Sequence, residues 1–324
     1  MKFLIEISKV IWAVDPFAEN VRLQRSAAWA ISKLSQETGS TVIQPIYLTN
    51  DWSREGIVPQ RWNRSFIEKI EAFGNDSLKD ITDKIPLKNI NPLQVISRPY
   101  ESIEQGAGEL LHSARIQGGN LIVASTRAGK GGGGPFALPG SFVETLSNLS
   151  GLPLLVVNPK WKHATGISSI VFPSDLSQES FEWFKRTLEF AKTTTAKVTL
   201  FHKTDFPLSQ PFETAVRVFP EIRDSLFRRV KASQIEAKRW AAVAEKSGVR
   251  LSVVIDSKMV GSLSEAVITC VEKHPGSVVV APPLSASYPR STIRKLMSRS
   301  PFPMLLVPTP VRADMRTLDF SKVT

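Results

Sequence analysis

The sequence predicts an α/β protein made of two tandem copies of one Rossmann-like domain, each with a five-stranded parallel sheet and helices on both faces. Three observations predict this fold class. The chain has 324 residues, about the length of two domains of roughly 150 residues each. Short apolar runs alternate along it with stretches of helical periodicity, which is the pattern of right-handed βαβ units. The order of these segments then repeats once, so each copy is expected to build its own sheet.

The repeat begins with an apolar run that ends in aspartate. It spans Val10–Asp15 in the first copy and Ile170–Asp175 in the second. The segments that follow come in the same order in both copies: helical patterns at Val21–Thr38 and Gln178–Thr193, then apolar runs around Val42–Leu48 and Val198–His202.

The later segments match more closely. Gly119–Ala124 parallels Gly276–Ala281, and Pro153–Val157 parallels Pro303–Val307. Short, continuous β-branched runs of this kind are typical of strands buried on both faces of a parallel sheet. Further helical patterns span Glu101–Ile116, Glu221–Lys246 and Ser264–Lys273. We therefore expect domains at residues 8–158 and 166–310, a linker at 158–166 and a polar tail from 311 to 324.

Charge and cysteine content indicate which partners and which cellular compartment the protein has. Lys and Arg number 41 and Asp and Glu 30, which gives a net charge of +11. Such an excess suits either solvated surface charge or an anionic partner: a nucleotide, a nucleic acid or an acidic protein. A single cysteine, Cys270, forms no internal disulfide, and no apolar stretch approaches the roughly 20 residues of a membrane span. We expect a cytoplasmic protein with no membrane partner.

A basic stripe near the end of the second copy contains no acidic residue. Its members are spaced as i, i+4 pairs on one helix. A solvated helix face is the default interpretation, and a docking surface for RNA, DNA or an acidic protein is the alternative. The stripe consists of Arg290, Arg294, Lys295 and Arg299.

Two segments of the first copy are expected at the carboxyl edge of its sheet, where doubly wound folds bind ligands. Asp15 follows the first strand, and the glycine-rich loop 125–140 follows the fourth. Glycines let backbone N–H groups turn towards an anion. Ser141 and Glu144 form a capping-box pattern that places a helix start, with its unpaired N–H groups, directly after the loop. The pattern predicts a phosphate site; the alternative is a glycine-rich loop that binds nothing.

The same loop differs from a Walker A motif. Gly129 and Lys130 have the Walker spacing, but Gly131 stands where a Ser or Thr would ligate Mg²⁺. Arg127 and Lys130 supply positive charge for a phosphate instead.

These residues resemble the universal stress protein family. The resemblance rests on Asp15 after the first strand, Gly140-Ser141 after the fourth, and Pro173–Ser180 at the start of the second copy. It extends from about residue 9 to residue 310 and implies an adenine nucleotide alpha hydrolase-like fold. Many members bind ATP. The resemblance implies a nucleotide site in the first copy made of Ala13, Asp15, Tyr47, Ser125, Arg127, Gly129, Lys130, Gly131, Gly132, Gly140 and Ser141.

Both copies depart from the family pattern. Ser125 and Ala128 stand where the first two loop glycines fall, and Tyr47 replaces the small apolar residue that faces adenine. A tyrosine there either stacks on the base or fills its place. The second copy keeps Asp175 but has a proline-containing segment, 282–291, in place of the loop. Prolines lack N–H donors, so this copy is expected to hold no phosphate.

Three function hypotheses remain open. The first is a stress-response protein that binds ATP or another adenine nucleotide in the first copy, with Mg²⁺ left open. The second is an interaction scaffold without nucleotide, in which the two copies act as a built-in dimer or the chain forms a homodimer. The third, supported only by charge, is a nucleic-acid-binding protein. Because no Gly-x-Ser-x-Gly, His-Glu-x-x-His or Cys-x-x-Cys pattern occurs, no catalytic or metal-binding residue is predicted and an enzyme is least favoured.

Overall fold

The described part of the chain covers most of the two predicted copies. In the computed structural model it comprises residues 7–18, 21–39, 41–50, 59–60, 63–98, 102–126, 141–158, 161, 167–204, 218–257, 262–274, 276–284 and 290–308.

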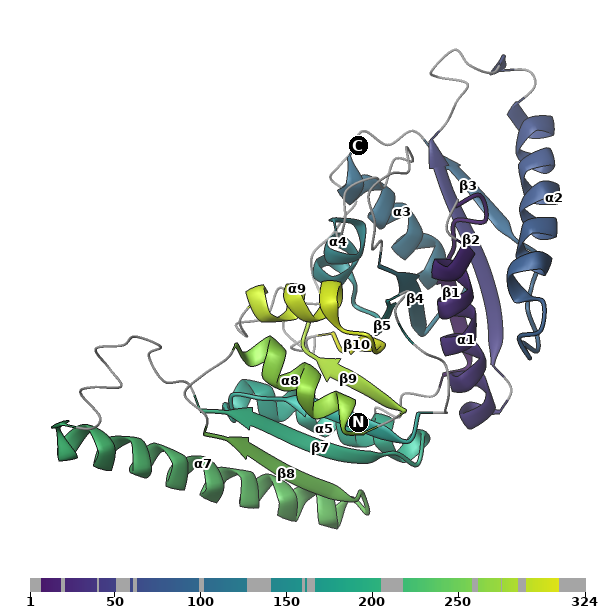
Figure 1. Cartoon of the computed structure of the whole chain (residues 1–324). Coiled ribbons are helices and arrows are strands. Elements are labelled where there is room, and N and C mark those ends of the chain that lie inside the picture. Colours follow the sequence, from purple (N-terminus) through teal and green to yellow (C-terminus); the bar gives the residue numbers. More distant parts are fainter. Residues whose placement is uncertain are drawn as a thin grey trace.

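Strands and helices alternate through the chain as predicted (Figure 1). The first half contains β1 (Lys9–Ala13), α1 (Val21–Thr38), β2 (Val42–Asn50), α2 (Asn63–Thr82), β3 (Gln94–Arg98), α3 (Ile103–Ile116), β4 (Leu121–Ser125), α4 (Ser141–Leu149) and β5 (Leu154–Val157). The second half contains β6 (Ser169–Pro173), α5 (Gln178–Thr193), β7 (Lys197–Lys203), α7 (Pro220–Lys246), β8 (Leu251–Asp256), α8 (Leu263–Glu272), β9 (Ser277–Ala281), α9 (Arg290–Arg299) and β10 (Met304–Leu306).

One strand order occurs twice. The first half is ordered β3-β2-β1-β4-β5 and the second β8-β7-β6-β9-β10, with all neighbours parallel within each half. This confirms the α/β, Rossmann-like fold class. The two sets are not separate sheets, because β5 and β10 pair antiparallel and join them into one ten-stranded sheet. The sequence did not predict this junction.

Helices cover both faces of the continuous sheet. Buried residues of α1, α2, α5 and α7 form one core layer with one face of the strands. Buried residues of α3, α4, α8 and α9 form the other layer. Adjacent strand residues alternate between the layers: Trp12 belongs to the first and Ile11 to the second. Each core layer therefore runs through both halves.

Local sequence accounts for several helix boundaries. The Ser102 side chain accepts a hydrogen bond from the Gln105 amide at the start of α3, and α8 begins with a capping box made by Ser262 and Glu265. On α1 the apolar side chains recur every three or four residues, which places them on one buried stripe. Its members are Leu23, Ala27, Ala28, Ile31 and Leu34.

Polar contacts also tie the halves together beside the β5–β10 junction. The Leu284 amide donates to Ser147 Oγ at 3.1 Å. Arg294 Nη2 lies 2.7 Å from Glu144 Oε2, so an α9 cation pairs with an α4 anion. The basic stripe contains no acidic residue of its own, but Arg294 is paired with one from the first half. Among the described helices, none has the length and apolarity needed to cross a membrane.

Candidate functional site

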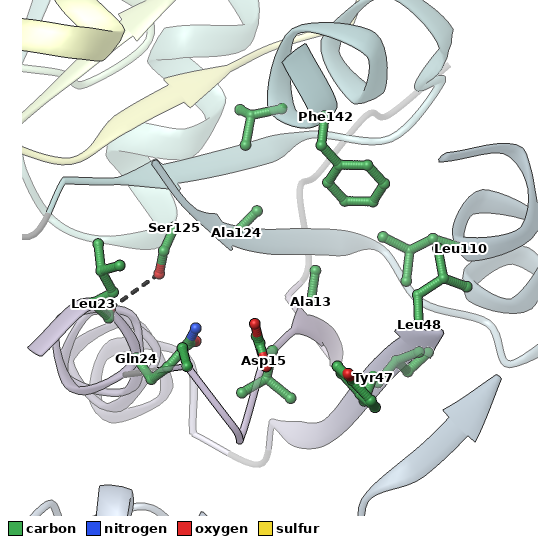
Figure 2. A pocket seen from close by; sticks show the side chains of 14 residues that line it. Ala13, Asp15, Leu23, Gln24, Tyr47, Leu48, Leu110, Ala124, Ser125 and Phe142 are labelled. Carbon is green, nitrogen blue, oxygen red and sulfur yellow. Dashed lines mark hydrogen bonds between the residues drawn. The ribbon is translucent and has the colours of Figure 1, made fainter. Parts of the chain in front are cut away.

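A pocket of about 100 Å³ lies at the carboxyl ends of β1, β2 and β4 (Figure 2). The chain winds outward from β1 to β2 and β3 and returns to β4 on the other side of β1. The pocket therefore lies at the topological switch point, where doubly wound sheets bind ligands. Its walls are Ala13, Val14, Asp15, Ala18, Leu23, Gln24, Ile46, Tyr47, Leu48, Leu110, Ala124, Ser125, Phe142 and Val143.

Asp15 enters the pocket through a turn that directly follows β1. The Val14 amide still donates to the Ile46 carbonyl at 3.0 Å, which keeps this end of the chain beside β2. The Phe17 amide then donates to Asp15 Oδ1 at 3.2 Å, and the Ala18 amide donates to the Asp15 carbonyl at 3.3 Å. Aspartate favours such turns because its side chain accepts a bond from the backbone two residues on. The turn holds the carboxylate at the pocket wall.

Tyr47 reaches the pocket from β2. Its ring meets the edge of the Phe17 ring, with centroids 5.3 Å apart and planes at 76°, a favourable aromatic geometry. Burial raises the pKa of Tyr47, and the negative charge of Asp15 raises it further, against the opposing hydrogen bond from Thr49. The phenol is therefore neutral at pH 7 and keeps its proton to donate.

Ser125 closes the pocket on the β4 side. Its hydroxyl donates to the Leu23 carbonyl at 3.0 Å, which ties the end of β4 to the first turn of α1. Gln24, the next residue of α1, turns its amide towards the same space as the Asp15 carboxylate (Figure 2). Phe142, in the first turn of α4, covers the opposite side.

The pocket is apolar with a few hydrogen-bonding groups and one charge. Asp15 is the only charged residue among the described residues that line it, and no Lys, Arg or His is among them. A phosphate placed beside the Asp15 carboxylate would be repelled by its charge, which costs free energy. The pocket is therefore suited to a neutral, largely planar group that carries hydrogen-bond donors.

Comparison with solved structures relates this architecture to a known fold. The chain matches a universal stress protein from Archaeoglobus fulgidus DSM 4304 with a TM-score of 0.59 at 16% identity, over 95% of this chain and 98% of that one. The chain has the universal stress protein fold. The resemblance found in the sequence is thus confirmed at the level of the fold.

Two further structures are similar at lower scores. One is a protein from Pseudomonas aeruginosa UCBPP-PA14 assigned to the universal stress proteins, with a TM-score of 0.49, 12% identity and 95% of each chain covered. The other is a universal stress protein in complex with cAMP, with a TM-score of 0.29, 18% identity, and 45% of this chain and 99% of that one covered. No protein-family model and no curated protein matches the sequence.

The predicted site residues fall into two groups on this universal stress protein fold. Ala13, Asp15, Tyr47 and Ser125 all line the pocket. Helix α4 begins at Ser141, as the capping pattern predicts. The Ser141 side chain lies outside the described part of the chain, as do the remaining predicted residues, Arg127, Gly129, Lys130, Gly131, Gly132 and Gly140.

Sequence reasoning missed Gln24 and Phe142. Gln24 did carry a signal, because it lies on the buried stripe of α1, three and four residues before Ala27 and Ala28. A polar residue on a buried helix stripe usually has a hydrogen-bonding role. Phe142 carried none, since an aromatic residue in the first turn of a helix is ordinary core sequence.

The equivalent edge of the second half is occupied by its own polar contacts. Asp175 accepts the Ser177 amide at 2.9 Å and the Ser180 hydroxyl at 2.6 Å, at the start of α5. By strand register His202 takes the place of Tyr47, since Phe201 pairs with Pro173 as Ile46 pairs with Ala13. His202 Nδ1 lies 2.9 Å from the Ser174 carbonyl and Nε2 lies 3.1 Å from the Ser233 hydroxyl. Asp175 and His202, the counterparts of Asp15 and Tyr47, are therefore both engaged within the chain.

No metal centre is evident in the described residues, where no group of three or more His, Cys, Asp or Glu side chains could hold an ion. The two contacts of His202 give this side chain a structural role.

Proposed function

We propose that the chain is a cytoplasmic stress-response protein that binds an adenine nucleotide, with its nucleoside part in the first-half pocket. In this proposal residues 8–158 and 166–310 act as tandem domains and the first one binds. One observation carries it: the pocket lies at the switch point of the sheet and presents Tyr47 and Asp15 from neighbouring chain segments in apolar surroundings. An aromatic ring, a carboxylate and apolar walls match a purine nucleoside, which is flat and carries N–H and O–H donors.

The phosphates extend towards the first turn of α4 in this arrangement. The N-terminal turn of a helix offers unpaired N–H groups and a positive dipole end. Phe142 and Val143, in that turn, line the pocket, so a nucleoside in the pocket lies within reach of the helix start. The Asp15 carboxylate then contacts only the uncharged nucleoside, and the phosphates lie away from it.

Thermal unfolding with and without ligand tests the proposal. A ligand that binds only the native state stabilises it by RT ln(1 + [L]/Kd), about 2.7 kcal/mol at a hundredfold excess over Kd. ATP, ADP and AMP are compared with and without Mg²⁺, and with GTP as a specificity control. We expect Tm to rise by several degrees with adenine nucleotides in the wild type and in Asp175→Asn, and less in Asp15→Asn. No rise with any nucleotide contradicts the proposal.

The contact between Phe17 and Tyr47 favours a second candidate, an interaction scaffold without nucleotide. In this case the Tyr47 ring permanently takes the place of a base. Tyr47→Ala distinguishes the two: it weakens adenine binding if the ring stacks on the base, and creates binding absent from the wild type if the ring fills its place.

A further inference from the structure

We propose that Gln24 is a selectivity residue of the first-half pocket, whose amide oxygen accepts a hydrogen bond from a donor on the ligand. This inference rests on the proposed function and specifies the class of ligand further. It concerns a part of the pocket that no resemblance to other proteins assigned.

The Gln24 side chain is buried without full hydrogen bonding. The residue is only 5% exposed. Its Oε1 atom is buried and has no hydrogen-bond partner among the described residues. Buried polar atoms are nearly always paired, and each exception calls for an explanation. Gln24 also lines the pocket, so rotation of its amide about the last side-chain bond would present Oε1 to a ligand donor there. A ligand atom is therefore the simplest missing partner.

Gln44, a second buried glutamine of the first half, differs from Gln24 because its amide is fully hydrogen-bonded within the chain. Gln44, on β2, is 8% exposed. Its Nε2 donates to the carbonyls of Pro45 and Pro92, each at 3.1 Å, and its Oε1 accepts from Asn91 Nδ2 at 3.0 Å. Gln44 thus satisfies both ends of its amide within the chain, and it does not line the pocket. It provides a matched control for Gln24.

The position of Gln24 defines the chemistry that it selects. Its amide lies beside the Asp15 carboxylate and faces the same space (Figure 2). A carboxylate is an acceptor only, and the unpartnered Gln24 atom is an acceptor too. Two neighbouring acceptors require a ligand with two nearby donors and disfavour anionic groups. In a purine ribonucleoside, the exocyclic amine and the vicinal ribose hydroxyls are the groups that supply such donors.

Titration calorimetry with four nucleosides identifies the donor. Adenosine has both donor groups, inosine lacks the amine, and 2′-deoxyadenosine and 3′-deoxyadenosine each lack one hydroxyl. We expect the wild type to bind adenosine at least tenfold more tightly than one of the other three. Gln24→Met, which keeps the length but removes the acceptor, is expected to lose that preference. Gln44→Met is expected to keep it.

Thermal stability without ligand gives a second, independent readout. Removing an unpartnered buried acceptor relieves a desolvation cost, whereas removing a paired one leaves its partners unsatisfied. Gln24→Met should therefore melt at the wild-type temperature or above, and Gln44→Met several degrees below. A Gln24→Met protein that melts as low as Gln44→Met would show that Gln24 is structural and would overturn the inference.

The outcomes separate this inference from the proposed function. If the wild type binds none of the nucleosides or nucleotides, the proposed function fails and the inference fails with it. If the wild type binds adenosine and Gln24→Met shows the same preferences among the four nucleosides, the inference is wrong while the proposed function stands.

Discussion

Replacing Asp175 by alanine should destabilise the protein at neutral pH. Its carboxylate accepts the Ser180 hydroxyl at 2.6 Å and the Ser177 amide at 2.9 Å, and so holds the turn between β6 and α5. Burial alone would raise the pKa of Asp175, but the hydrogen bonds from Ser180 and Ser177 outweigh it and hold the pKa below its usual value. The ionised form is thus the one that the fold stabilises.

The size of the effect follows from these bonds. Asp175 stands two residues before Ser177, the N-cap of α5, and a hydrogen bond to a charged group contributes about 1.5–3 kcal/mol. Partial exposure of the carboxylate reduces this figure, so we expect Asp175→Ala to lower the unfolding free energy by about 2 kcal/mol. Because the folded-state pKa is depressed, this contribution is complete above the unfolded pKa of about 3.9 and is lost as pH falls through the folded pKa.

Urea denaturation from pH 7 down to pH 3 measures the difference between wild type and Asp175→Ala. The difference should be largest at pH 7 and shrink below about pH 4. Asp15→Ala is the matched control, since Asp15 accepts a longer bond, 3.2 Å, from the Phe17 amide; it should cost less stability but abolish ligand binding. A loss at Asp175 below about 0.5 kcal/mol, or one that grows on acidification, refutes the reasoning.

Three further predictions concern the core, the pocket and the junction between the halves. Trp240→Ala should lower the free energy of unfolding, measured by urea denaturation, by about 3–5 kcal/mol. The reason is that Trp240 is 1% exposed in an aromatic cluster of the second half. A loss under about 1 kcal/mol would contradict that packing. Tyr47 should ionise above pH 10 in ultraviolet titration, assigned by difference from Tyr47→Phe, and Asp15→Asn should lower its pKa by removing the nearby charge; an unchanged pKa would exclude that coupling. Arg294→Glu should lower the free energy of unfolding by no more than about 1 kcal/mol, since the Arg294 side chain is 53% exposed. Adding Glu144→Arg to this variant should restore much of the lost stability. If the effects of the two substitutions simply add, the pair is not coupled.

Most elements of the fold could be predicted because their signals are local. The helix predicted at 21–38 coincides with α1, and the one at 178–193 with α5. Both have an apolar stripe with helical spacing, so the sequence alone marks their length. β3 and α2 were not located individually. β3 is an edge strand of the sheet with partly exposed residues, so it lacks the continuous apolar run of a buried strand.

The union of the two sheets could not be predicted from β5 and β10. Both strands are apolar and buried on both faces, which indicates a position inside a sheet. Nothing in their side chains encodes the direction or identity of the neighbouring strand, since strand pairing is made by backbone groups that every residue carries. The antiparallel pairing therefore appears only in the structure.

The position of the candidate pocket was predictable from the sequence, but its full lining was not. Asp15 was found because it follows a recognisable strand, and Tyr47 because the resemblance to universal stress proteins implies an adenine-facing residue at its position. Gln24 was missed because it belongs to a helix that the sequence marks by its apolar residues, and its unpartnered oxygen depends on the packing around it. The pairing of Arg294 with Glu144 joins residues 150 positions apart on different halves, a distance at which charge patterning along the sequence carries no information.

Titration calorimetry of the intact chain with ATP, AMP and adenosine tests the central claim most directly. The account predicts one site per chain, lost in Asp15→Ala and retained in Asp175→Ala under conditions where both variants are folded. Two sites per chain, binding that survives Asp15→Ala but not Asp175→Ala, or no binding of any adenine compound would contradict it.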